Sequence, residues 1–186
     1  MIDKCCISTF YGHVFDPTSP TAEDICIEDI AHALSYLSRA NGHFRAFYSV
    51  ARHSINCAKE VKAQGFTEKV QLLALLHDSA EAYIGDLTRP LRRHIPAFSD
   101  YERNLQKLIY EKYATTDVTD EERAAVKAAD DALLYHEFKM FHGAELFKAP
   151  PELHIALTAD TDFQKTEAEF SAMYHALKDG VDLSAK

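Results

Sequence analysis

The stretch LLALLHDSAEAYIGDLTRP, residues 72–90, joins a strongly apolar run to a cluster of titratable side chains. The apolar run ends at position 76, and His77, Asp78 and Glu81 follow immediately. Such a run favours a buried helix. Charged side chains are rarely buried in a hydrophobic core unless they are paired, so core packing alone does not explain the charged groups at the end of the run. The stretch is therefore interpreted as a buried helix that carries a functional site at its C-terminal end.

Length and composition favour one globular domain that extends over residues 1–186. A chain of 186 residues is long enough to bury a sizeable core, and 47% hydrophobic with 26% charged residues is typical of a globular protein. The formal net charge of -9 argues against a nucleic-acid partner, because a phosphate backbone requires clustered Lys and Arg. A small anionic substrate is compatible with this charge if a metal ion and one or two arginines hold it.

The sequence carries no sign of a membrane segment or of export. It has no run of 18 apolar residues, and residues 1–12 lack the apolar segment that follows a basic start in an export signal. The cysteines, at positions 5, 6, 26 and 57, form no CxxC pair, which is typical of reduced thiols. We therefore expect a cytoplasmic protein without a membrane partner.

Helical spacing of apolar residues dominates the chain. Ile27, Ile30, Leu34 and Leu37 lie on one face of a helix that is predicted to stop at Asn41-Gly42. Further helices are predicted over residues 48–62, 67–84, 99–114 and 119–142, and a last one over about 161–178.

Local signals refine the ends of these elements. Gly85 is expected to stop the helix around the apolar run, and Ser99 or Asp100 to cap the next one. Thr119 and Glu122 form a capping box at the start of the long helix. Residues 5–15 alternate around a glycine, which favours a small β-hairpin within an N-terminal appendage of residues 1–20. The sequence thus predicts an all-α fold with a small N-terminal β-hairpin and a core of about residues 28–142.

Histidine and acidic side chains elsewhere can complete a metal site begun by His77 and Asp78. An imidazole nitrogen and a carboxylate oxygen together suit a divalent transition metal. The candidate additional ligands are His53, on a mostly apolar helical stripe, and Asp130 or Asp131 in the segment VKAADD. Each also has a structural interpretation, because a histidine can be satisfied in a core and an acidic pair can solvate a helix face.

In this order, His53, His77, Asp78 and Asp130 resemble the metal-binding signature of the HD-domain phosphohydrolases. HDSAEAYIGDLTRP is similar to the HDxxE and GDLxxP motifs of the bacterial 5′-deoxynucleotidase branch, and VKAAD to its VKxAD, which selects Asp130 as the ligand. SRANGHFRAFYSVARHS resembles the segment with the family's phosphate-binding arginine and first histidine. The resemblance covers about residues 28–140 and implies an HD-domain helical bundle.

The resemblance implies a metal-dependent phosphohydrolase whose substrate is a small deoxynucleotide, and also a homodimer. One divalent ion (Co²⁺, Mn²⁺, Zn²⁺, Mg²⁺ or Fe²⁺) would be held by His53, His77, Asp78 and Asp130. Glu81 matches the glutamate that orients or deprotonates the attacking water. Its alternative role is a hydrogen bond to a ligand histidine.

Two further residues match the substrate contacts of the family. Arg39 would bind the phosphate group in a bidentate manner, and its alternative is a solvated helix end. Asp86 matches the residue that meets the sugar 3′-hydroxyl, and its alternative is a turn residue. The relatives follow the arginine with a tryptophan that excludes ribose, whereas Ala40 follows here and the chain has no Trp. Cys57, four residues after His53, is interpreted as core packing.

The main expectation is a 5′-deoxynucleotidase that releases phosphate from deoxynucleoside 5′-monophosphates. Because the chain lacks this tryptophan, we expect a larger substrate pocket. A larger pocket would also admit deoxynucleoside triphosphates, so their hydrolysis by the same fold is the second expectation. A third alternative is a catalytically idle nucleotide sensor or scaffold. The four ligand positions and Glu81 are all present, which favours an enzyme.

Overall fold

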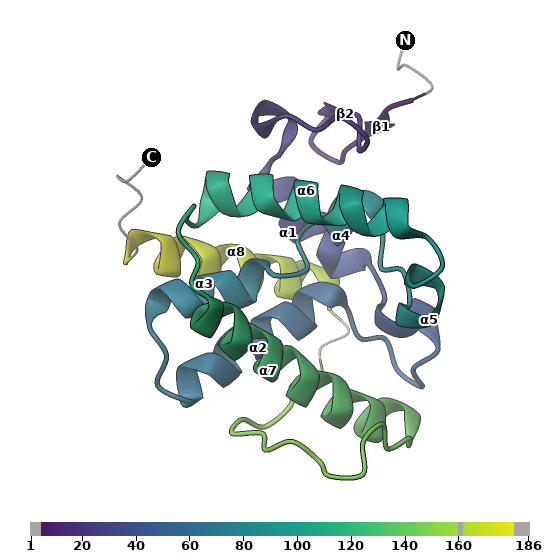
Figure 1. The fold of residues 1–186 in the computed structure, drawn as a ribbon, viewed down its shortest axis with the longest axis vertical. Coiled ribbons are helices and arrows are strands. Elements are labelled where there is room, and N and C mark those ends of the chain that lie inside the picture. Colours follow the sequence, from purple (N-terminus) through teal and green to yellow (C-terminus); the bar gives the residue numbers. More distant parts are fainter. Residues whose placement is uncertain (1–4, 160–161, 181–186) are drawn as a thin grey trace.

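The computed structural model describes residues 5–159 and 162–180, and most of these residues are helical (Figure 1). The longer helices are α1 (Ile27–Tyr36), α2 (Val50–Ala63), α3 (Glu68–Leu76), α6 (Pro96–Tyr113), α7 (Asp120–Glu137) and α8 (Phe163–Asp179). Shorter segments are η1 (Ala22–Asp24), η2 (Arg39–Gly42), α4 (Glu81–Ile84), α5 (Arg89–Arg92) and the π-helical η3 (Phe138–His142). With a two-stranded sheet near the N-terminus, this confirms the predicted all-α class with a β-hairpin.

The hairpin pairs β1 (Ile7–Ser8) with the antiparallel β2 (Val14–Phe15). Gly12 occupies the left-handed region in the turn, with φ +87°, a conformation that costs a glycine nothing. The backbone N–H of Tyr11 and Nδ1 of His13 contact the two carboxylate oxygens of the buried Asp29 at 2.9 and 2.7 Å. These contacts fasten the hairpin to α1. Residues 1–4 of the predicted appendage, and residue 161 of the predicted last helix, lie outside the described residues.

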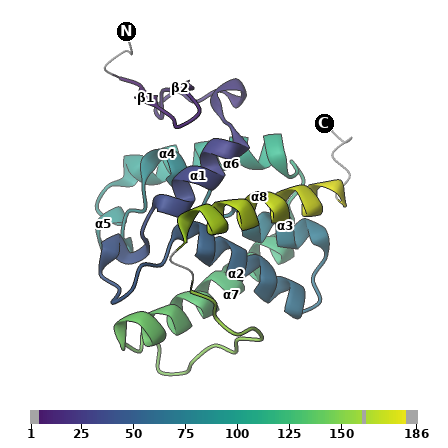
Figure 2. The same cartoon turned by 180° about the vertical axis from the view of Figure 1, so that it is seen from behind.

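Helix α2 lies at the centre of the arrangement and contacts α1, α3, α7 and α8. In Figure 1, α7 runs in front of α2, and in the reverse view of Figure 2, α8 crosses the bundle beside α1. Because α2 is surrounded, eleven of its fourteen residues are buried, and several of them are polar or charged. Buried polar groups need partners, and those of His53 belong to the site described below.

Helix α1 ends at Tyr36, so the predicted stop at Asn41-Gly42 is wrong. Residues 37–39 form strand-like pairs with residues 48–50 instead of continuing the helix. Val50 N donates to Leu37 O at 3.0 Å, and Arg39 N donates to Tyr48 O at 2.9 Å. The pairing satisfies the backbone groups that a further helical turn would have used.

The long helix predicted around the apolar run is interrupted after Leu76 and resumes as α4. Nδ1 of His77 donates to the carbonyl oxygen of Ala74 at 2.7 Å, an acceptor that a continuing helix would use. Gln106 of α6 bridges the break, since its Nε2 donates to Leu76 O at 2.7 Å and its Oε1 accepts from Ala80 N at 3.0 Å. The pattern of apolar residues did not reveal this break, because the compensating amide comes from another helix.

Two other helix ends agree with the local signals, and a third does not. Gly85 ends α4 with φ +79°, as expected. The capping box of Thr119 and Glu122 opens α7 as predicted. Helix α6 begins at Pro96 rather than at a cap on Ser99 or Asp100, because proline is well suited to a first helical turn. None of the described helices is long and apolar enough to cross a membrane.

Candidate metal centre

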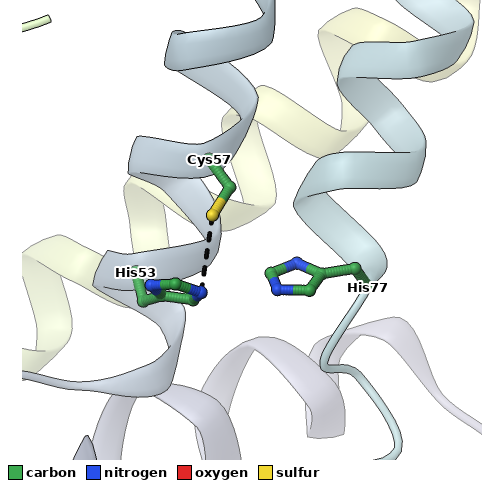
Figure 3. A group of neighbouring side chains, drawn as sticks. All are labelled: His53, Cys57 and His77. Atoms are coloured by element: carbon green, nitrogen blue, oxygen red, sulfur yellow. Dashed lines mark hydrogen bonds between the residues drawn. The ribbon is translucent and has the colours of Figure 1, made fainter. Parts of the chain in front are cut away.

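Two histidines from neighbouring elements face each other in the middle of the fold. His53 lies on α2 and is fully buried, and His77 directly follows α3. Their ring centroids are 5.2 Å apart. Figure 3 shows both rings with the thiol of Cys57 beside them, and one potential ligand atom of each of the three side chains lies within 4.8 Å of the other two.

Two carboxylates complete the cluster. Asp78 Oδ2 lies 3.2 Å from His77 Nε2 and 3.7 Å from His53 Nε2. Asp130 Oδ1, from α7, lies 3.4 Å from His53 Nε2 and 4.0 Å from His77 Nε2. Nitrogen and oxygen ligands about 2.0–2.2 Å from a common ion stand roughly 3–4 Å from one another. The fold thus brings all four predicted ligands together at distances that suit one divalent ion.

The nitrogen Nε2 of His77 provides a test of whether these residues fit a metal. This atom is buried and has no hydrogen-bond partner among the described residues. The other ring nitrogen, Nδ1, donates to Ala74 O, so in a neutral ring Nε2 carries the lone pair. A buried acceptor without a partner is costly, and a bound ion would remove that cost. The donor set therefore fits a divalent metal.

The two aspartates are held in the charged form that a metal ligand requires. Burial alone would raise the pKa of Asp78, but His77 and Arg39 hold it well below its usual range. Burial acts in the same direction on Asp130, and there the hydrogen bond with His53 lowers the pKa well below its usual range. Both carboxylates are thus available as anionic ligands.

Asp130 and its neighbour Asp131 point in different directions. Asp131 Oδ1 pairs with Lys127 and lies 3.2 Å from Arg89 Nη2, and its side chain is 38% exposed. The side chain of Asp130 is 17% exposed and reaches His53. The solvated role that the sequence left open for the acidic pair therefore suits Asp131 alone.

Arg39 is buried beside the cluster instead of lying at a solvated helix end. Its Nη1 lies 3.2 Å from Asp78 Oδ2, and its Nε lies 3.5 Å from Glu137 Oε2. Burial alone would lower the pKa of this guanidinium, but Glu137 and Asp78 raise it. The next two residues, Ala40 and Asn41, have φ of 52° and 50°. Such strained backbone in non-glycine residues concentrates at functional sites.

A cavity of about 450 Å³ opens beside the cluster, and this volume is within the range of small-molecule sites. Its polar wall includes Arg39, Asp78, Glu81, Asp86 and Asp130. Its apolar wall is formed by Leu87, Pro90, Leu134, Phe138, Leu146 and Phe147. Both predicted substrate contacts and the predicted catalytic residue therefore line one cavity with two of the predicted ligands.

Glu81 is nearly buried, and it is only weakly engaged. Its Oε2 has no hydrogen-bond partner among the described residues, and its Oε1 lies 3.8 Å from Arg92 Nη2. Burial raises the pKa of Glu81 well above its ordinary value, and the charges of Asp78 and Asp86 raise it further. A carboxylate whose pKa is raised in this way is suited to accept a proton near neutral pH.

Glu137 is a member of the site that the sequence interpretation did not select. It is fully buried, and its Oε1 lies 2.7 Å from His53 Nδ1 and 2.8 Å from the hydroxyl of Tyr48. Burial alone would raise the pKa of Glu137, but His53 and Arg39 lower it. The signal was its position two turns after Asp130, on the same face of the helix.

Cys57 belongs to the buried core, as expected, but its thiol also adjoins the cluster. Sγ lies 3.4 Å from His53 Nε2, the ring nitrogen that faces Asp78 and Asp130. Burial raises the pKa of the Cys57 thiol to about 11. Core packing is therefore an incomplete description of this residue.

Two curated bacterial proteins are similar to the chain. It is 37% identical to the uncharacterized protein YfdR of Escherichia coli strain K12 over 131 residues, which are 70% of this chain and 69% of YfdR. It is 35% identical to the uncharacterized protein RCAP_rcc00048 of Rhodobacter capsulatus over 126 residues, which are 64% of each chain. No protein-family model matches the chain. On the identity and coverage with the first of these relatives, the chain belongs to the same protein family as YfdR of Escherichia coli.

Proposed function

We propose that the chain is a metal-dependent phosphohydrolase with an HD-domain fold that releases phosphate from deoxynucleoside 5′-monophosphates. The observation that carries this proposal is the convergence of His53, His77, Asp78 and Asp130, with one buried imidazole nitrogen left without a partner among the described residues. These four side chains would hold one divalent ion. The resemblance to the HD-domain phosphohydrolases supplies the reaction class and the substrate class.

The protein's own residues divide the work around the substrate. A bound divalent ion would supply Lewis-acid stabilisation of the charge on the phosphoryl group. Arg39 would donate to phosphoryl oxygens, since its guanidinium is held at the edge of the cavity by Asp78 and Glu137. Glu81 would take the proton of the attacking water, and Asp86 would accept a hydrogen bond from the sugar 3′-hydroxyl. The apolar wall leaves room for the nucleobase.

A deoxynucleoside triphosphate is the second candidate substrate. A cleft of about 700 Å³ adjoins the cluster on the side of α6 and shares Asp78, Glu81 and Arg92 with the first cavity. Arg103 and Lys107 also line this cleft. The cleft would offer space and cationic partners to phosphate groups beyond the one at the metal centre, so the release of triphosphate is included in the test.

The test is a phosphate-release screen of the full chain after removal of metal with a chelator. Deoxy- and ribonucleoside mono- and triphosphates are each assayed with Co²⁺, Mn²⁺, Mg²⁺ and Zn²⁺, and the triphosphates are also assayed for inorganic triphosphate. We expect metal-dependent turnover of deoxynucleoside monophosphates. Asp130→Ala should abolish turnover and bound metal, whereas the matched neighbour Asp131→Ala should retain both. If the chain binds nucleotides but turns none of them over with any of the metals, the proposal of an enzyme is wrong and that of a nucleotide sensor or scaffold takes its place.

A further inference from the structure

The thiol of Cys57 adjoins the nitrogen of His53 that would bind the ion. Nδ1 of His53 is engaged by Glu137 at 2.7 Å, which leaves Nε2 for a metal. Cys57 follows His53 by one turn of α2, and its Sγ lies 3.4 Å from this Nε2. The same sulfur lies within 4.8 Å of a ring nitrogen of His77 (Figure 3). The thiol thus stands among the proposed ligands.

The separation between sulfur and nitrogen matches that of two ligands of one ion. An imidazole nitrogen about 2.0–2.1 Å from an ion and a thiolate sulfur about 2.3 Å from it lie about 3.1–3.6 Å apart when the angle at the ion is between about 90° and 109°. A second observation also points to a ligand at this place. The side chain of His77 is only 10% exposed, and its Nε2 has no hydrogen-bond partner among the described residues.

We infer that Cys57 is a further ligand of the proposed metal centre, which therefore prefers a thiophilic ion such as Zn²⁺ or Co²⁺ over Mg²⁺ or Mn²⁺. A thiolate is a soft ligand that favours Zn²⁺, whereas Mg²⁺ and Mn²⁺ favour oxygen donors. On binding, the ion replaces the thiol proton, which passes to solvent. The inference rests on the proposed metal centre and adds to it the identity of the ion.

The experiment loads the chelator-treated full chain with one equivalent of Co²⁺ and records its absorption spectrum. A cobalt–thiolate bond produces a charge-transfer band in the near ultraviolet, whereas histidine and carboxylate ligands alone produce only the weaker visible bands. We expect the band in the wild type and its loss in Cys57→Ser and Cys57→Ala. Zn²⁺ affinity should fall in both variants by at least the ~10–100-fold that loss of an outer-sphere partner costs, with Mg²⁺ affinity unchanged.

Cys26→Ser is the matched control, because Cys26 belongs to a second group of potential ligands with His13 and Asp29. This variant should retain the full cobalt–thiolate band. If the wild type binds cobalt without the band, or if the band persists in Cys57→Ala, the thiol is not a ligand although the metal centre stands. If neither Co²⁺ nor Zn²⁺ binds at all, the proposed metal centre fails as well. X-ray absorption of the zinc-loaded wild type gives an answer that needs no variant, namely the presence or absence of a sulfur neighbour at about 2.3 Å.

Discussion

The imidazole of His53 donates its Nδ1 hydrogen to Glu137 Oε1 over 2.7 Å, while its Nε2 faces the carboxylates of Asp78 and Asp130. The glutamate is ionised and can only accept, so the hydrogen bond determines which nitrogen is left for a metal. Glu137 also contacts Arg39 at 3.5 Å. One buried carboxylate thereby positions both a proposed metal ligand and the proposed phosphate-binding residue.

Removal of this carboxylate should weaken metal binding. Glu137→Gln keeps an oxygen near His53 but loses the negative charge, and we expect the affinity for Zn²⁺ to fall by roughly 10–100-fold in calorimetric titration. Glu137→Ala should also lower stability by about 1–3 kcal/mol, because buried groups lose their acceptor. Glu145→Gln serves as control, since that side chain is 63% exposed. Equal metal affinity in Glu137→Gln and wild type would mean that His53 is oriented by packing alone.

Loss of Glu81 should separate chemistry from binding. Because Glu81 lines the cavity without being a proposed ligand, Glu81→Ala should keep its metal and its substrate affinity. Turnover should decrease by roughly two to four decades, the usual contribution of a positioned general base. Steady-state kinetics together with metal analysis tests this. A kcat close to that of the wild type would assign Glu81 a structural role.

Variants of Asp86 should show whether its carboxylate contacts the 3′-hydroxyl of the substrate's sugar. Asp86 lies just after Gly85 and lines the same cavity as Arg39. Asp86→Ala should reduce kcat/KM by a factor that corresponds to a loss of about 1–3 kcal/mol in transition-state stabilisation, because the 3′-hydroxyl loses its acceptor. Asp86→Asn should keep part of the contact. The wild type should hydrolyse a 2′,3′-dideoxynucleotide with a lower kcat/KM than the matching 2′-deoxynucleotide. In Asp86→Ala the difference between these two substrates should be small. An equal dideoxy penalty in both enzymes would show that the carboxylate and the hydroxyl do not interact.

Ala40 should determine how strictly ribose is excluded. Its small side chain lines the cavity directly after Arg39, at the position where the resembling enzymes carry a tryptophan. We expect the wild type to discriminate weakly between deoxy- and ribonucleotides, and Ala40→Trp to raise KM for ribonucleotides more than for deoxynucleotides. The ratio of the two kcat/KM values measures this effect. Ala40→Leu controls for bulk without an aromatic ring, and an unchanged ratio in Ala40→Trp would place ribose exclusion on another side chain.

The pH dependence of stability should report on a contact between His154, in the segment that follows η3, and Glu60 of α2. Nδ1 of His154 lies 2.7 Å from Glu60 Oε1 on α2, and this hydrogen bond raises the pKa of His154 above its ordinary value. The charged form is thus favoured in the folded state. The stabilisation is complete below the ordinary pKa of about 6.5 and is lost as pH rises through the higher folded pKa.

Thermal unfolding of the wild type and His154→Gln from pH 5.5 to 8 checks this expectation. The difference in Tm between the two proteins should shrink as the pH rises. The control is His94→Gln, which replaces an exposed histidine and should leave the profile unchanged. A difference that stays constant or grows toward pH 8 would contradict the assignment.

Local features of the sequence were sufficient for the helical class and for many of the elements. The alternation around Gly12 predicted the hairpin, Thr119 with Glu122 predicted the start of α7, and Gly85 predicted the end of α4. These signals are local, because a cap or a turn is satisfied by residues only a few positions away. The candidate ligands and substrate contacts were also named from the sequence, by their order and by the motifs that they resemble.

The tertiary structure decided which of these residues meet and what supports them. Leu37 leaves the helical conformation because Val50 offers a backbone partner, and the break after Leu76 is stable because Gln106 arrives from α6. The roles of Glu137 and Cys57 depend in the same way on contacts made in the folded chain. The sequence by itself determined the helical pattern and the set of candidate ligands. Only the packing of α2 against α3 and α7 determined the geometry of the site, because hydrogen bonds and ligand distances between separate segments have no local signal.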